Sequence, residues 1–150
     1  MVDQEAPRPA TPDQLAAVRQ MRAWFVLVAV LALHVADEAL TGFLEFYNPL
    51  VLTIRSRVAW FPMPTFSFDV WLTGLVVLVL VLAMLAGAVW RGVPGTRLAS
   101  WVLSVIMFAN GVGHLAGSVY FQRWLPGATT APLLLVASWR LAHATWSRPR

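Results

Sequence analysis

One apolar segment that carries charge decides the fold: Leu31-Ala-Leu-His34-Val-Ala-Asp37-Glu38-Ala-Leu-Thr41-Gly-Phe-Leu-Glu45. It continues a hydrophobic run that begins near Met21, and the whole stretch is long enough to cross a membrane as a helix. An ionisable side chain at the centre of a bilayer costs roughly 2.5–3.5 kcal/mol on insertion scales. One imidazole and three carboxylates here therefore need a partner, a proton, a water-filled cavity or a metal ion, and they indicate a functional site.

The composition of the whole chain is typical of a membrane protein. Of its 150 residues, 59% are hydrophobic and 12% are charged, whereas a soluble domain has about 25% charged residues. The net charge of +4 comes from Arg alone, and in a membrane protein it indicates topology, not nucleic-acid binding. The absence of Cys excludes disulfides and thiolate metal sites.

Four hydrophobic stretches predict membrane-spanning helices, at about residues 21–46, 68–90, 96–122 and 130–146. Short loops join the last three stretches, which makes neighbouring helices antiparallel. The predicted fold class is therefore an all-α integral membrane protein, a four-transmembrane-helix up-down bundle. We expect the first span to stop before Asn48-Pro49 and a long connection, residues 47–67, to follow it.

The ends of the chain are predicted to lie outside the bundle. We expect residues 1–11 to form a disordered N-terminal tail, residues 12–146 a single four-helix transmembrane domain, and residues 147–150 a C-terminal tail. Thr11-Pro12-Asp13-Gln14 predicts a helix start, with Thr at the N-cap, Pro at the first position and Gln as the capping-box partner.

The distribution of Arg predicts the orientation. With both termini in the cytoplasm, that side holds eight Arg residues and the other side holds Arg55, Arg57 and Arg123. Cytoplasmic loops are enriched in Arg and Lys, so both termini are predicted to be cytoplasmic. We expect an integral protein of a bacterial-type plasma membrane, in contact with membrane lipid.

The polar residues of the first predicted span share one helical face. At 100° per residue, they fall within an arc of about 100°. Lipid would not tolerate such a stripe, so it is predicted to face the interior of the bundle. The stripe consists of His34, Asp37, Glu38, Thr41 and Glu45.

The third predicted span carries a second polar group, Asn110-Gly-Val-Gly113-His114-Leu-Ala-Gly117-Ser118. Gly113 and Gly117 form a small-xxx-small pair, which predicts close approach of another helix. Counted from the cytoplasmic ends of their spans, His34 and Asn110 both lie about 20 Å deep. The two polar groups are therefore expected to converge at one level of the membrane.

Imidazoles and carboxylates together are typical ligands of Zn²⁺, Fe or Mn²⁺. We predict a divalent metal ion as a possible cofactor, with ligands drawn from His34, Asp37, Glu38 and His114. The carboxylate left free would act as a general base, and the predicted catalytic residues are Asp37, Glu38 and Asn110. Residues predicted to touch substrate or to form the rim are Thr41, Glu45, Arg55, Arg57 and Ser118.

The sequence resembles the HXXEE-motif family of small integral membrane proteins, which is marked by that motif, a second downstream histidine and a YXPG motif. His34-Val-Ala-Asp37-Glu38 matches the first motif with Asp in place of Glu, and His114 matches the second histidine. Trp124-Leu-Pro-Gly127 matches the third motif with Trp in place of Tyr. The resemblance covers roughly residues 31–136. It implies a membrane fold and the location of the site, and it does not supply a reaction, because the function of the family is uncharacterised.

Several functions remain open at this point. The first is a membrane metalloenzyme, with hydrolysis favoured, that acts on a lipid-like or other apolar small molecule. The second is a metal-free acid/base isomerase or cyclase. The third is a proton- or cation-handling transporter or a non-enzymatic subunit, in which a homodimer could complete the polar lining. A structural polar network is the alternative without any such function.

Overall fold

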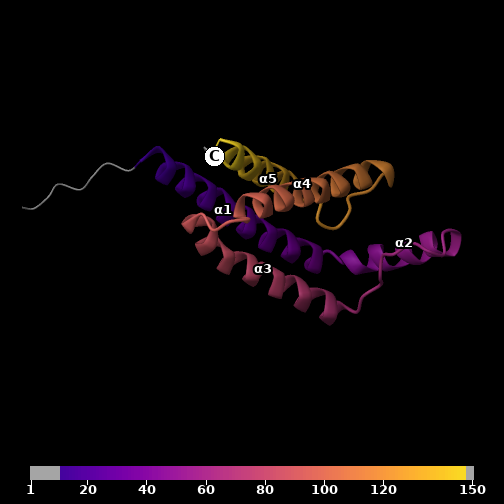
Figure 1. The fold of residues 1–150 in the computed structure, drawn as a ribbon. Coiled ribbons are helices and arrows are strands. Elements are labelled where there is room, and N and C mark those ends of the chain that lie inside the picture. The colour runs from indigo at the N-terminus through magenta and orange to yellow at the C-terminus, as the bar shows by residue number, and fades with distance from the viewer. Residues whose placement is uncertain (1–10, 148–150) are drawn as a thin grey trace, which may run out of the picture.

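The computed structural model describes residues 11–147, and this part of the chain is all-helical. The tails expected at residues 1–11 and 147–150 lie outside the described residues, except for Thr11 and Ser147. Five helices follow one another, as Figure 1 shows: α1 (Pro12–Leu40), α2 (Phe43–Arg57), α3 (Phe68–Arg91), α4 (Thr96–Tyr120) and α5 (Ala131–Trp146).

The predicted start of the first helix is confirmed. Thr11 is the N-cap of α1, and its hydroxyl accepts a hydrogen bond from the backbone N–H of Gln14. The side chain of Gln14 in turn accepts from the N–H of Thr11 at 2.9 Å, and Pro12 occupies the first helical turn. This capping box satisfies backbone donors that the first turn of a helix otherwise leaves unpaired.

The predicted end of the first span is wrong. The helix ends at Leu40, and not at Phe46, because Gly42 adopts a left-handed conformation with φ of +78°. Both the N–H and the hydroxyl of Thr41 donate to the carbonyl of Asp37, which closes the last turn. Glu45 therefore does not continue the polar stripe of α1, because it lies on a different helix.

The expected long connection at residues 47–67 is also wrong over its first half, where α2 continues to Arg57. Pro49 lies inside this helix and does not end one. Inside a helix a proline removes one backbone hydrogen bond and strains the preceding turn, and α2 continues through Pro49 despite this cost. The segment after α2 then returns along it, because the side-chain amide of Asn48 bonds both the carbonyl and the N–H of Phe66.

Helix α1 lies in the middle of the molecule, with α3 along one side and α5 along the other (Figure 1). Helix α4 packs mainly against α5, and α1, α3, α4 and α5 run alternately in opposite directions. The core contains Trp24, whose indole N–H donates to the carbonyl of Leu82 at 2.8 Å, so that α1 is bonded to α3. From α5, Leu134 and Leu141 are fully buried in the same cluster.

Three of the helices in the described part are long and apolar enough to cross a membrane, namely α1, α3 and α4. Helix α5, with 16 residues, is about 24 Å long and is shorter than these three. The outward faces of α3 and α4 expose many large apolar side chains, among them Val76, Leu80, Val105 and Ile106. Such continuous apolar surfaces are typical of a protein surrounded by lipid.

A glycine other than the predicted pair lets two helices approach closely. A Cβ atom at Gly111 would lie 3.0 Å from the side chain of Leu135 and 3.1 Å from the carbonyl oxygen of Ala131, so α4 meets α5 here. At Gly113 a Cβ would meet nothing within 4 Å, and at Gly117 it would meet Leu125 of the following loop at 2.8 Å. The predicted pair therefore does not form a helix–helix contact.

We expect Gly111→Ala to destabilise the protein relative to Gly113→Ala by about 1–3 kcal/mol, because only the first substitution forces a methyl group between packed helices. Both substitutions change helix propensity by the same amount, so their difference isolates the contact. The measurement is the free energy of unfolding of the two variants in detergent. Equal stabilities would contradict the close approach at Gly111.

Candidate metal-binding site

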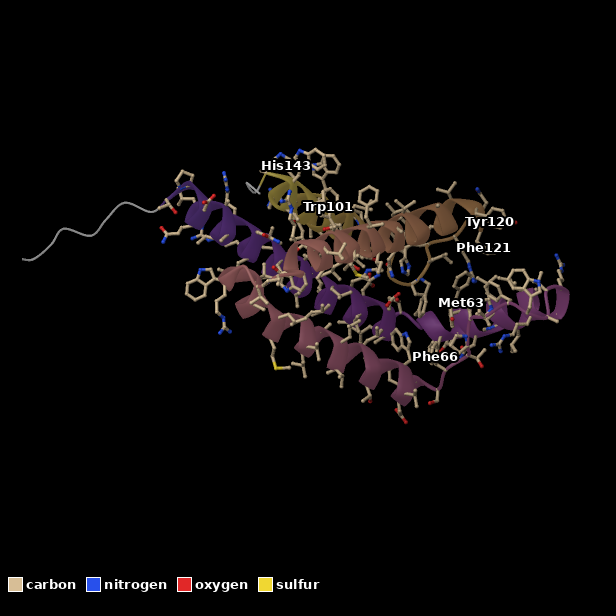
Figure 2. The ribbon with its side chains drawn as sticks, in the orientation of Figure 1. Met63, Phe66, Trp101, Tyr120, Phe121 and His143 are labelled. Atoms are coloured by element: carbon tan, nitrogen blue, oxygen red, sulfur yellow. The ribbon has the colours of Figure 1, made fainter. Side chains whose placement is uncertain are left out.

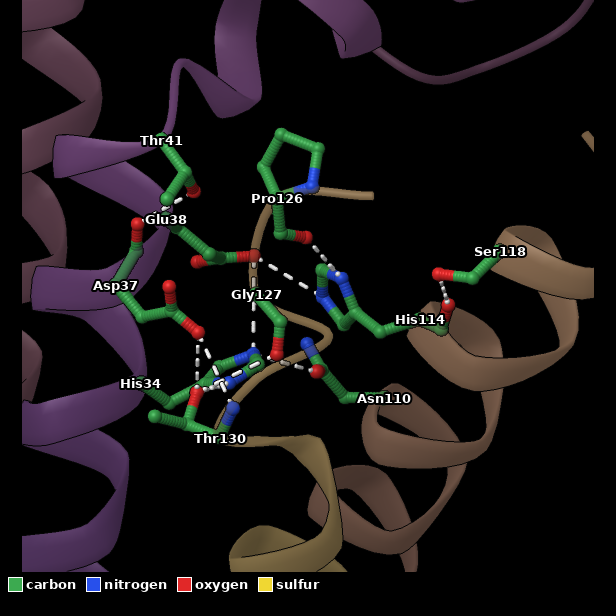
Figure 3. Close-up of polar contacts among 10 residues, drawn as sticks. All are labelled: His34, Asp37, Glu38, Thr41, Asn110, His114, Ser118, Pro126, Gly127 and Thr130. Atoms are coloured by element: carbon green, nitrogen blue, oxygen red, sulfur yellow. Dashed lines mark hydrogen bonds and ion pairs between the residues drawn. The ribbon is translucent and has the colours of Figure 1, made fainter. Parts of the chain in front are cut away.

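The site lies where the end of α1 meets α4 and the loop between α4 and α5 (Figure 3). Three of the four predicted ligands come together here: His34 and Glu38, one turn apart on α1, and His114 on α4. Each can offer one ligand atom, and the three atoms lie within 4.8 Å of one another. All three side chains are buried, and we call them the His–Glu–His group.

His114 is held by the loop on one side and faces Glu38 on the other. Its Nδ1 lies 2.7 Å from the carbonyl oxygen of Pro126, which can only accept a hydrogen bond. Nδ1 therefore carries the hydrogen. Nε2, at the opposite edge of the ring, lies 3.1 Å from Oε1 of Glu38.

His34 is oriented by a relay that runs through Thr130. The hydroxyl of Thr130 lies 2.9 Å from Oδ2 of Asp37 and 2.8 Å from Nδ1 of His34. An ionised carboxylate only accepts, so the hydroxyl donates its single hydrogen to Asp37 and accepts from Nδ1–H of His34. The other nitrogen of His34, Nε2, is then turned toward the interior of the site, 3.7 Å from Oε1 of Glu38.

Asp37 is the predicted ligand that the structure does not place in the group. Its Oδ2 accepts from both the backbone N–H of Thr130, at 3.1 Å, and the hydroxyl of Thr130. Thr130 is the N-cap of α5, so this carboxylate lies at the positive end of a helix, where negative charge is stabilised. Asp37 therefore joins α1 to α5 and reaches the site only through Thr130.

The geometry concentrates lone pairs on one point. Both imidazoles donate Nδ1–H away from the site, and both turn Nε2 toward the same carboxylate oxygen. The rings are nearly perpendicular, with centroids 4.8 Å apart. Neutral Nε2 atoms and a carboxylate are all acceptors, and they repel one another unless a proton or a cation lies between them.

Asn110 joins the site from α4, as the matching depths predicted. Its side-chain oxygen lies 3.1 Å from Nε2 of His34. The two ends of an amide occupy nearly the same space, so Asn110 can present either its oxygen or its NH₂ group to that nitrogen. It can therefore accompany His34 in a protonated or in a neutral state.

The residues predicted for the rim have separate structural roles. Thr41 closes the end of α1, and the hydroxyl of Ser118 donates to the carbonyl of His114 and accepts from the N–H of Leu125. Arg55 and Arg57 lie in the last turn of α2. Burial raises the pKa of the Tyr47 phenol above its ordinary value, and the charge of Arg55 offsets part of that rise.

Two pockets adjoin the His–Glu–His group on either side of Phe43, which lines both. The larger has a volume of about 540 Å³ and includes Glu38 and Glu45 in its lining. The smaller, about 170 Å³, includes Asn110 and His114. Of the predicted rim residues, Glu45 is thus the one that shares a pocket with a member of the group. The two pockets approach the group from different sides of Phe43.

Sequence reasoning did not identify Thr130, Pro126 and Gly127 as parts of the site. The Trp124-Leu-Pro-Gly stretch was the available signal, and it was used only as a motif of the family resemblance. The turn in fact supplies the acceptor for His114 and the space beside it. Gly127 has φ of +81°, and a Cβ there would lie 2.7 Å from His114 and 3.0 Å from Glu38.

We expect Gly127→Ala to destabilise the protein by about 1–3 kcal/mol more than Gly95→Ala does. Both glycines have positive φ, so both variants bear the conformational cost of about 1–2 kcal/mol, but a Cβ at Gly95 meets nothing within 4 Å. The additional loss at Gly127 measures the displacement of His114. Unfolding free energies of the two variants provide the test, and similar losses would contradict the close contact.

We expect Thr130→Val to lower the free energy of unfolding by about 1–3 kcal/mol, because Nδ1–H of His34 loses its acceptor in a buried position. Thr130→Ser keeps the hydroxyl and is the matched control. Nitrogen NMR of the His34 ring should report Nδ1–H in the wild type and in the Ser variant. Loss of that tautomer in the Ser variant, or its retention in the Val variant, would contradict the relay.

Comparison with known proteins gives one match. A family model described as a protein of unknown function with HXXEE motif covers residues 24–140. No curated protein and no solved structure matches the chain. The matched range contains the His–Glu–His group, Asp37 and the loop that supports them. In the motif of this chain, His34 and Glu38 form part of the group and Asp37 supports His34 through Thr130. The chain belongs to the HXXEE family, whose members are of unknown function.

Proposed function

We propose that the His–Glu–His group binds a divalent metal ion and that the protein is a membrane metalloenzyme with hydrolase-type chemistry. The observation that carries the proposal is the direction of the two imidazoles. Each donates Nδ1–H to an acceptor outside the group, and each turns Nε2 toward Glu38. Histidines that bind metals almost always donate their other ring N–H to a carboxylate, a carbonyl or water in this way.

A cation also resolves the electrostatics of the group. Three buried acceptors that face one another are unfavourable, and a metal ion converts their repulsion into attraction. The two supporting acceptors, Pro126 and the Thr130–Asp37 pair, keep both rings in the tautomer that a metal requires. The set of two imidazoles and one carboxylate suits Zn²⁺, Fe or Mn²⁺.

The number of ligands favours catalysis over a purely structural role. Catalytic zinc sites typically have three protein ligands, including sets of two His and one Glu, and keep a fourth position open. A metal bound here would supply a Lewis acid beside the pockets that adjoin Glu38 and His114. Since Asp37 is engaged by Thr130, Glu45 is the carboxylate available in the larger pocket as a general base.

A second candidate is metal-free acid/base chemistry, as in an isomerase or cyclase. The 3.1 Å contact between Nε2 of His114 and Glu38 favours it, because a proton shared at that position would also remove the repulsion. The same shared proton would serve a proton-handling transporter. Metal content distinguishes these candidates from the metalloenzyme.

We further infer that α5 is the fourth membrane-spanning helix and that both termini are cytoplasmic. Residues of α5 are buried against α1 and α4, so it belongs to the same bundle, and its length of about 24 Å is adequate with modest local thinning of the bilayer. The distribution of Arg supports the orientation. The substrate would then be an apolar molecule that reaches the site from the membrane.

Elemental analysis of protein purified in detergent without chelators tests the proposal. We expect close to one Zn, Fe or Mn per chain in the wild type. His34→Ala, His114→Ala and Glu38→Gln should lower metal affinity by at least about 100-fold, because even supporting residues cost 10–100-fold. His143→Ala is the matched control, because His143 lies exposed in the last turn of α5.

Two results would contradict the metalloenzyme. The first is folded wild-type protein that binds Zn²⁺, Fe²⁺ and Mn²⁺ no more tightly than Glu38→Gln does. The second is equal loss of metal in His143→Ala, which would place the ion elsewhere. The first result would favour the metal-free candidate, and the shared proton between His114 and Glu38 would then be sought by NMR.

A further inference from the structure

We propose that the larger pocket beside Glu38 binds the single apolar chain of an uncharged acyl ester or amide, whose carbonyl lies at the His–Glu–His group. The inference rests on the proposed function, because it assigns the carbonyl to the metal. It adds where the chain lies, which residues limit its length, and which headgroup charge the site accepts.

The pocket has the character of a chain-binding site. It lies between the end of α1, the first two turns of α2 and the first turn of α3, and its volume of about 540 Å³ is within the range of small-molecule sites. Most of its lining is apolar, including the aromatic residues Phe43, Phe66, Phe68 and Trp71. Glu38 is part of the same lining, so a ligand in the pocket is in direct contact with the proposed metal ligands.

The walls are held in place without a ligand. Asn48 bonds the backbone of Phe66 through both ends of its amide, and the hydroxyl of Tyr47 donates to the carbonyl of Pro64 at 3.0 Å. Phe66 is thereby fixed on the segment that returns from α2 to α3 (Figure 2). The ring of Phe43 stacks on Trp71 at 5.7 Å, which joins α2 to α3 across the pocket. Pre-formed walls lower the entropic cost of binding.

The charges in the lining indicate the ligand's polar group. Its two ionisable side chains are the carboxylates of Glu38 and Glu45, and the amide of Asn48 is already engaged by Phe66. A divalent metal ion bound at the group would neutralise Glu38 and leave Glu45 as the free carboxylate of the lining. Glu45 would repel an anionic headgroup, whereas an uncharged carbonyl would need only the metal. This distinguishes an acyl ester or amide from a phosphate or a free fatty acid.

The position along α1 agrees with this class of ligand. Glu38 lies two residues before the end of α1, a candidate membrane span, so its Cα is about 3 Å along the axis from that end of the helix. The carbonyl of an acyl ester in a bilayer lies at the boundary between hydrocarbon and headgroups. With the end of α1 at that boundary, the group is within reach of such a bond.

Linear hydroxamic acids provide the probe, because the hydroxamate binds metals and the alkyl chain can be varied. Protein loaded with Co²⁺ in detergent would be titrated with the C2 to C14 compounds, and the visible spectrum of Co²⁺ would report binding at the metal alone. We expect affinity to rise by up to about fourfold per methylene and then to reach a plateau when the pocket is filled. Partition of the alkyl chain into detergent micelles would instead change the apparent affinity steadily with chain length, without a plateau. That change would be the same in all variants.

Ala39 and Ala36 offer a matched pair of variants. Ala39 lines the pocket, whereas Ala36 lies three residues earlier on the exposed face of α1. We expect Ala39→Phe to bind the C2 compound within about twofold of wild type and the C10 compound at least about tenfold more weakly. Ala36→Phe should retain the wild-type series, and Ala39→Val should reach its plateau at a shorter chain.

The outcomes separate this inference from the proposed function. If no hydroxamate changes the spectrum because no Co²⁺ is bound, the metal site itself is wrong. If the C2 compound binds but the series is identical in Ala39→Phe, Ala39→Val and Ala36→Phe, the metal site stands and the chain pocket is overturned. Decanoate or decyl phosphate that displaces the C10 hydroxamic acid at least as well as methyl decanoate does would overturn the assignment of an uncharged headgroup.

Discussion

Glu38 is a carboxylate held between two imidazoles in an apolar interior, and the rest of the structure depends on keeping it there. Its Oε1 lies 3.1 Å from His114 and 3.7 Å from His34. Buried charge is costly unless it is paired, so α1 and α4 must hold these side chains in register. The contacts of α5 with both α1 and α4 serve this requirement, because His114 on α4 could not meet Glu38 on α1 if either helix shifted by one turn.

The loop between α4 and α5 converts this cluster of polar residues into an organised site. Pro126 accepts from His114, Gly127 leaves space for its ring, and Thr130 connects His34 to Asp37. A loop of about ten residues thus determines the tautomer of both imidazoles. The turn geometry is needed as well as the ligands to keep the Nε2 lone pairs of both imidazoles turned toward the group. Supporting residues determine metal affinity almost as strongly as ligands do.

Much of the fold could be predicted because it follows from local rules. Residue spacing along the chain is enough to predict the capping box at Thr11 and the bounds of α3. Because lipid excludes charged side chains, it also predicts that His34 and Glu38 share a face turned away from the lipid. The break at Gly42 could not be predicted, because a glycine continues or ends a helix according to its tertiary surroundings. The continuation of α2 through Pro49 was missed because proline was assumed to end a helix.

The sequence by itself determined that the polar residues of two helices would meet. The helical repeat and the depth along each predicted span placed four polar residues at one level, because a helix has a fixed rise and a bilayer excludes unpaired charge. These residues are His34, Glu38, Asn110 and His114. Only the tertiary structure decided what each of them does. Asp37 and Glu38 are neighbours with the same charge, yet one caps α5 through Thr130 and the other faces two imidazoles. Their separation is set by the 100° between consecutive side chains on α1 and by what packs against each face, which no local pattern contains.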